Sequence, residues 1–124
     1  MALTLSQRFG DGVSFNPSAK TLTIDLNDLS SILVSGVDLG LDTSGMTDAN
    51  KDEYADGIFW ALVQRQREQQ PDNNNDETVG IYVTNRGKTS ATRNGVAQFA
   101  FNLNIAGYKN DTEGVNLDPD AIGS

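Results

Sequence analysis

The chain has 124 residues with 9 basic and 17 acidic side chains, a formal net charge of −8, and neither cysteine nor histidine. This length suits one ordinary domain, and we expect a single domain over residues 1–124. The missing residue types exclude disulfides, thiolate and imidazole metal sites, cysteine nucleophiles and histidine acid–base pairs. We therefore expect no enzyme, and no catalytic, cofactor-binding or metal-binding residues. The acidity argues against binding of nucleic acid or an anionic membrane by the whole surface.

Residues 1–20 predict an N-terminal arm followed by a loop. Leu3 and Leu5 alternate with Thr4 and Ser6, which is typical of a short strand that is half-buried or pairs with a neighbouring sheet. A basic start followed by an apolar run is missing, so we expect no signal peptide. The longest apolar stretch, 57–63, is far shorter than the roughly 20 residues of a membrane span, so we expect no transmembrane segment.

Residues 21–106 predict an α+β core, with one main helix packed on a small antiparallel β-sheet. A strand is expected at 21–26, followed by a short helical segment at 28–33 with Asn27 as its N-cap. The clearest element is a helix over 47–69, which begins at Thr47 and ends before Pro71. The helical spacing of its apolar residues predicts one broad buried face that includes Phe59, with Trp60 off its centre.

Two further strands are expected at 79–83 and 96–106, with the alternation of antiparallel strands that have one solvated face. In the second, one face holds the larger apolar side chains: Phe99, Phe101, Leu103 and Ile105. The segment 85–95 either projects as a long hairpin closed at an Asn or Gly turn, or stays mobile. Residues 107–124 have few apolar anchors, so we expect an extended tail that orders on a partner.

The basic residues are unevenly distributed. Arg65 and Arg67 lie near the end of the main helix, where we favour a role in complementing its negative C-terminal end. Arg86, Lys88 and Arg93 lie in the 85–95 segment and are candidates for a patch that binds an acidic protein surface or phosphate.

One acidic spacing, Asp72-x-Asn74-x-Asp76, resembles the opening of a calcium-binding loop. Glu77 stands where that loop needs glycine, and the twelfth position is Val83 rather than glutamate, so a plain turn is favoured. A metal-dependent hydrolase built on carboxylates is the third functional hypothesis, and it predicts an activity that chelators remove.

Three stretches resemble small virion proteins of cyanobacterial tailed phages, the capsid cement or decoration proteins: MALTLSQRFG at 1–10, TLTIDL at 21–26 and LDPD at 117–120. The resemblance implies a non-enzymatic protein that binds the outer surface of the major capsid protein lattice, or another virion protein, and stabilises the head. It also implies a homo-oligomer, with a trimer favoured, located on the capsid surface. Neither membrane nor direct nucleic-acid contact is expected, and no functional residue is carried over.

The residues themselves lead to a similar hypothesis, an interaction protein whose arm, 85–95 segment and tail contact sister subunits or a larger lattice. The expected partner-binding residues are Leu3, Leu5, Phe9, Arg86, Lys88, Arg93, Tyr108, Val115, Leu117 and Ile122. The alternative is a small acidic binding module that uses the basic loop at 86–93 to bind an acidic partner or single-stranded nucleic acid, in a salt-sensitive way.

Overall fold

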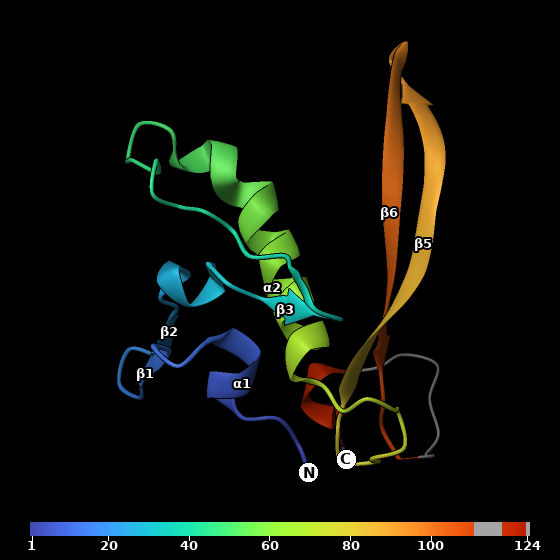
Figure 1. The fold of residues 1–124 in the computed structure, drawn as a ribbon. Coiled ribbons are helices and arrows are strands. Elements are labelled where there is room, and N and C mark those ends of the chain that lie inside the picture. The colour runs from blue at the N-terminus through green and yellow to red at the C-terminus, as the bar shows by residue number, and fades with distance from the viewer. Residues whose placement is uncertain (111–117, 124) are drawn as a thin grey trace. The chain divides into compact units, whose positions relative to one another are not determined.

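The computed structural model describes residues 1–110 and 118–123, and its fold is α+β, as predicted (Figure 1). Its contacts divide the chain into two compact units, an N-terminal unit (Ala2–Asp72) and a C-terminal unit (Met1 with Asn73–Ser124). The division of a single domain into segments 1–20, 21–106 and 107–124 stays a prediction.

The N-terminal unit holds most of the helical and several short extended elements. Its elements in chain order are α1 (Leu5–Phe9), β1 (Ser14–Asn16), β2 (Thr21–Thr23), η1 (Leu26–Leu29), β3 (Leu33–Val34), β4 (Val37–Asp38), η2 (Lys51–Tyr54) and α2 (Ala55–Gln69). β1 pairs with β2 and β3 pairs with β4, both antiparallel. The β3–β4 turn places Ser35 and Gly36 at φ of 51° and 79°, the positive values that a tight two-residue hairpin turn requires.

The strand predicted at residues 3–6 is wrong, because this segment leads into the short helix α1. Thr4 is its N-cap: the Thr4 hydroxyl accepts from the Gln7 amide at 3.1 Å, and the Gln7 side chain accepts from the Thr4 amide at 2.9 Å. This reciprocal capping box pairs two amides that would otherwise lack partners, which favours a helical turn over an extended strand.

Arg65 holds the other end of α1. Its guanidinium donates from Nε to the Gln7 carbonyl at 2.9 Å and from Nη2 to the Ser6 carbonyl at 3.0 Å, and Nη1 pairs with Glu68 at 2.9 Å. The role expected for Arg65, at the negative end of its own helix, is therefore incomplete, because two of its bonds reach backbone carbonyls of α1. The Ser6 carbonyl also accepts from the Gly10 amide at 2.8 Å. Arg67 donates instead to the Gln64 side chain at 2.9 Å.

Three other boundaries differ from the predictions. The strand expected over 21–26 ends at Thr23, because the Asp25 carboxylate accepts from the Asn27 amide and caps η1, a role expected of Asn27. The helical segment expected at 28–33 is the single turn η1, and the chain is extended again at β3.

The main helix begins later than expected, at Ala55, but it ends at Gln69 as predicted. Thr47 does not cap it. Thr47 and Asn50 each bond the other's backbone amide, which forms a separate turn before η2. Local side-chain-to-backbone bonds of this kind compete with helix formation.

The core of the N-terminal unit lies between α2 and the 26–41 segment. Leu29, Ile32 and Ala61 are buried at its centre, and the partly buried residues packed against them are Leu26, Val34, Leu41 and Leu62. α2 packs against α1, η1 and β3 in this unit. Gly10 and Gly12 approach the Asp28 side chain so closely that a Cβ at either position would overlap it, which fixes the α1–β1 connection to η1.

The C-terminal unit is dominated by one long antiparallel hairpin, β5 (Ile81–Arg93) and β6 (Val96–Gly107), drawn as a two-stranded ribbon in Figure 1. It closes at Asn94 and Gly95, whose φ values of 49° and 74° are those of a type I′ turn. Of the two alternatives predicted for residues 85–95, the hairpin is therefore confirmed. We call residues 81–107 the hairpin arm.

Residues 118–123 fold back instead of extending. Asp118 caps the short turn η3 (Pro119–Ala121), and the Gly123 amide donates to the Tyr108 carbonyl at 2.7 Å. Gly80 lies against Ile122, where a side chain at position 80 would overlap it. The last described residues are therefore docked on the base of the hairpin arm.

Candidate interaction surface

The hairpin arm has one apolar face, formed mainly by β6. Directly paired residues in an antiparallel ladder share a face, and the faces alternate along each strand. The pairs on the apolar face are Phe99 with Ser90, Phe101 with Lys88, Leu103 with Asn85, and Ile105 with Val83. We call this set the arm face.

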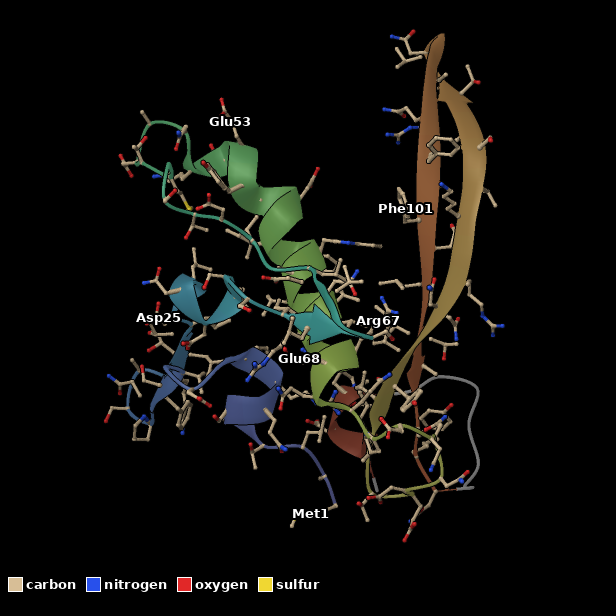
Figure 2. The ribbon with its side chains drawn as sticks, viewed as in Figure 1. Met1, Asp25, Glu53, Arg67, Glu68 and Phe101 are labelled. Atoms are coloured by element: carbon tan, nitrogen blue, oxygen red, sulfur yellow. The ribbon has the colours of Figure 1, made fainter. Side chains whose placement is uncertain are left out.

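The arm face is largely exposed. Phe99, Phe101 and Ile105 keep 60%, 63% and 52% of their surface accessible, whereas Val83, nearer the base, is buried. Figure 2 shows Phe101 on β6. Three large apolar side chains aligned on one face of a two-stranded ribbon differ from the scattered exposed apolar residues of ordinary surfaces, and such clusters mark interaction sites.

The basic residues of the arm do not form a single patch. Lys88 lies on the arm face with its Nζ 4.7 Å from the centre of the Phe99 ring, a cation–π contact. Arg93 lies on the opposite face, where its Nε donates to Gln98 at 2.7 Å. Arg86 falls at the register shift between Asn85 and Lys88. The loop predicted at 86–93 is thus a β-strand that presents its charges in different directions.

The arm nevertheless has a distinct charge. Residues 81–107 contain three basic and no acidic side chains, a net charge of +3 in a chain of −8. Residues 2–72 carry 5 basic and 11 acidic side chains, a net charge of −6.

A second exposed surface lies on the N-terminal half of α2. Phe59 was expected in the buried face, and this expectation is wrong because the side chain is 69% exposed. Trp60 is 40% exposed, and Asp56, one turn earlier, neighbours both rings at spacings of three and four residues. We call the set Asp52, Glu53, Asp56, Phe59 and Trp60 the α2 face, and Figure 2 shows Glu53 near its start.

The other expected contact residues are placed variously. Leu5 is half exposed on α1, while Leu3 and Phe9 are partly buried in the unit where α1 packs on α2. Tyr108 and Ile122 are both moderately exposed beside the hairpin base. Val115 and Leu117 lie outside the described residues. The described residues among the ten thus belong to two units, and their contact with a partner stays a prediction.

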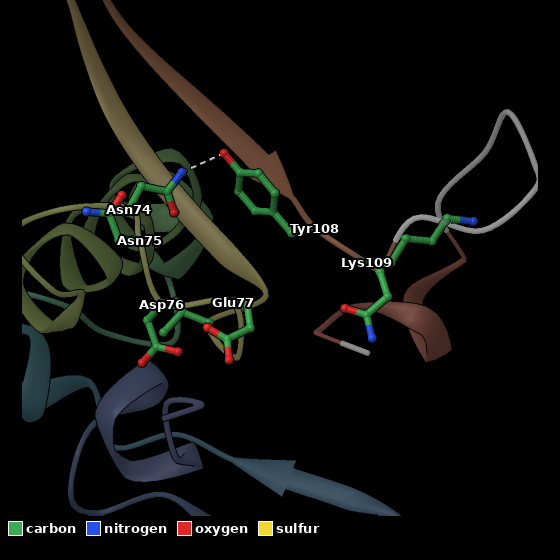
Figure 3. A pocket seen from close by; sticks show the side chains of 8 residues that line it. Asn74, Asn75, Asp76, Glu77, Tyr108 and Lys109 are labelled. Atoms are coloured by element: carbon green, nitrogen blue, oxygen red, sulfur yellow. Dashed lines mark hydrogen bonds between the residues drawn. The ribbon is translucent and has the colours of Figure 1, made fainter.

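A small hollow lies beside Tyr108, whose hydroxyl accepts from the Asn74 side chain at 2.6 Å (Figure 3). Its volume is about 210 Å³, and it is lined by Asn74, Asn75, Asp76, Glu77, Val79, Tyr108, Lys109 and Asn110. Pockets for small organic ligands usually measure about 300–1,000 Å³ and are mostly apolar. This hollow is smaller and lined mainly by polar residues, so it does not have the character of a ligand pocket.

The segment from Asp72 to Asp76, whose spacing resembles a calcium loop, forms a turn in the structure. The Asp76 carboxylate accepts from the Thr78 amide at 2.9 Å and from its hydroxyl at 2.6 Å, which is an Asx-type turn that leads toward β5. Within residues 1–110 and 118–123, no cluster of three or more potential acidic ligands is placed to hold a metal ion. Over the same residues, no helix has the length and apolarity that a bilayer span requires.

No protein-family model, curated protein or solved structure matches this chain significantly. Support for a function therefore comes from the exposed surfaces of the two units and from the resemblance of the three sequence stretches.

Proposed function

We propose that this chain is a non-enzymatic structural protein that works by assembly, and that it binds the outer surface of a phage capsid as a cement or decoration protein. One observation supports the assembly role most directly, the exposed apolar side chains of the arm face. The resemblance of residues 1–10, 21–26 and 117–120 to virion proteins supports the choice of a capsid as the partner.

The arm face favours a partner for energetic reasons. An isolated two-stranded hairpin is at best marginally stable in water. Most of the arm's residues from 84 to 99 are exposed, so the distal part receives little support from its own unit. Phe99, Phe101 and Ile105 are each at least half exposed. Burying the exposed surface of each side chain would contribute about 1 kcal/mol to the free energy of binding. Partner binding would therefore both cover the apolar residues and hold the ribbon.

A sedimentation experiment tests this proposal. Emptied heads of the phage that encodes this chain, stripped of decoration, are mixed with the purified protein and pelleted. We expect the wild-type protein to pellet with the heads and Phe101→Ser to remain in the supernatant. Phe15→Ser is the matched control, because Phe15 is an equally aromatic, 52% exposed β-strand residue of the other unit. If the wild-type protein stays in the supernatant and is missing from purified virions, the proposal is wrong.

A second function, binding of single-stranded nucleic acid or an acidic partner, is favoured by the three basic and no acidic residues of the arm. The opposite orientation of Lys88 and Arg93 counts against a shared phosphate groove. Its test is binding of a labelled oligonucleotide as a function of salt. The triple reversal of Arg86, Lys88 and Arg93 to Glu should abolish binding, and an unchanged affinity would eliminate this function.

A further inference from the structure

The arm face and the α2 face have complementary chemistry. On the arm face, Lys88 lies among exposed aromatic rings, pairing with Phe101 and contacting Phe99. On the α2 face, Asp56 lies one helical turn from Phe59 and Trp60. Each surface therefore combines exposed aromatic side chains with a central charge, and the two charges are opposite.

The complementarity extends beyond this pair of charges. Residues 48–56 contain four acidic residues and one lysine, a net charge of −3. That lysine, Lys51, is already paired with Asp48 at 2.7 Å. The hairpin arm carries +3 with no acidic residue. Opposite potentials of this kind align partners and favour one pairing over others.

From these observations we infer that the arm face of one copy docks on the α2 face of a second copy of this chain. The inference rests on the proposed assembly function and names a second copy, rather than the capsid itself, as the partner that covers the arm face. Head binding then depends on Phe101 through the assembly of the copies. Each copy then gives one arm and receives one, in a reciprocal pair.

Charge distinguishes this contact from the obvious alternative, edge-to-edge pairing of two arms. Such pairing is a general tendency of edge strands, and among the described strands β5 and β6 pair only with each other. However, arm-to-arm pairing would bring two +3 segments together, and like charges placed opposite each other disfavour association. The acidic α2 face presents no such conflict.

Charge reversal combined with mass measurement tests the inference. The wild-type protein should associate in sedimentation equilibrium, and Lys88→Glu and Asp56→Lys should each weaken association by about tenfold or more. Arg93→Glu is the matched control, because it reverses an arm charge on the opposite face and should leave association close to that of the wild type. Circular dichroism confirms that each variant is folded.

Mixing the variants separates contacts between copies from contacts within one chain. Lys88→Glu mixed with Asp56→Lys should form mixed pairs, since both arm contacts in such a pair join opposite charges. A contact within one chain could be rescued only by placing both substitutions on the same chain. The inference is overturned if the wild-type protein is monomeric, if neither reversal weakens association, or if only the same-chain double variant recovers.

The capsid assay keeps this result distinct from the proposed function. A monomer that still pellets with heads would overturn the inference and leave the proposed function in place. A protein that associates through Lys88 and Asp56 but neither binds heads nor occurs in virions would overturn the proposed capsid binding and leave the inference in place.

Discussion

Arg65→Ala should destabilise the N-terminal unit strongly, because one buried guanidinium joins α1 to α2. Its side chain is only 12% exposed, and it makes three bonds: to the carbonyls of Ser6 and Gln7 and to the carboxylate of Glu68. The substitution leaves all three acceptors without this donor. Glu68, at 18% exposure, also becomes a largely buried charge that has lost its arginine partner.

The expected loss in the free energy of unfolding is about 3 kcal/mol. Removing one partner of a buried ion pair costs roughly 3–5 kcal/mol, and we take the lower end because water reaches part of Glu68 and the end of α1. A unit of about 70 residues is typically stable by roughly 4–10 kcal/mol. The substitution should therefore remove a large part of the unit's free energy of unfolding. A helix of five residues cannot persist without tertiary contacts, so α1 should detach first.

Urea unfolding followed by fluorescence measures this loss, because Trp60 is the only tryptophan and lies in α2. Arg65→Lys should recover part of the stability, since an ammonium keeps the charge but cannot reproduce the planar fork of donors. Lys51→Ala is the control for a surface pair of the same spacing: Lys51 is 55% exposed and Asp48 is 95% exposed. This control should cost about 0.5 kcal/mol or less. Equal losses for Arg65→Ala and Lys51→Ala would refute the reasoning.

Four further substitutions have definite expected outcomes. Leu29→Ala, at a fully buried position, should cost about 2–5 kcal/mol in urea unfolding. Gly95→Ala should lower the thermal midpoint of the hairpin, because a Cβ at φ of 74° costs about 1 kcal/mol. Gly80→Ala should release residues 118–123, measured as faster amide exchange at Gly123. Asp38→Asn should reduce the acid sensitivity of the N-terminal unit, measured as urea midpoints at pH 7 and pH 3.

The sign of the Asp38 effect follows from its hydrogen bonds. The amides of Gly40 and Ile32 donate to its carboxylate at 2.9 and 3.1 Å, and these bonds lower the pKa of Asp38 in the folded state. The stabilisation of the folded state by the Asp38 carboxylate is therefore complete above its unfolded pKa of about 3.9. It is lost as the pH falls through the lower pKa of the folded state. An equal drop between pH 7 and pH 3 in the wild type and Asp38→Asn would contradict this account.

Each of the other three predictions has an equally clear contrary result. A loss below about 1 kcal/mol for Leu29→Ala would mean that this position is not in a packed core. An unchanged hairpin midpoint for Gly95→Ala would argue against the type I′ turn. Unchanged exchange at Gly123 in Gly80→Ala would show that the contact between Gly80 and Ile122 does not hold the last described residues.

The helix α1 was predictable in part from the sequence. The Thr4-x-x-Gln7 spacing is a capping-box pattern, but the alternation of Leu3 and Leu5 over only four residues favoured a strand. The hydrogen bonds that Arg65 makes to α1 could not be predicted from the sequence, because Arg65 lies 58 and 59 positions from the carbonyls that it binds. Short elements of this kind are determined by tertiary contacts more than by local pattern.

The hairpin arm was more accessible to prediction. Both strands alternate over a long run, and Asn94-Gly95 is among the strongest short signals for a tight hairpin turn. The register shift between Asn85 and Lys88 was not predictable from the sequence. It decides whether Lys88 lies on the same face of the hairpin as Phe101. Because a one-residue change of register reverses the facing of every side chain, the candidate surface could only be defined from the paired strands.

The exposure of Phe59 shows that the main helix buries fewer of its large side chains than its apolar spacing predicted. Helical spacing identifies apolar residues on a helix, but the side that becomes buried depends on what packs against it. In the N-terminal unit, α1, η1 and β3 pack against α2 and bury Ala61, while Phe59 stays open beside acidic residues. The arm leaves Phe101 open beside Lys88 in the same way. Each unit thus leaves aromatic side chains unburied next to charges of one sign, and the signs are opposite. An assembly that pairs these surfaces would complete the apolar burial and neutralise both charges in one contact, which is the physical reason to test the arm and α2 together.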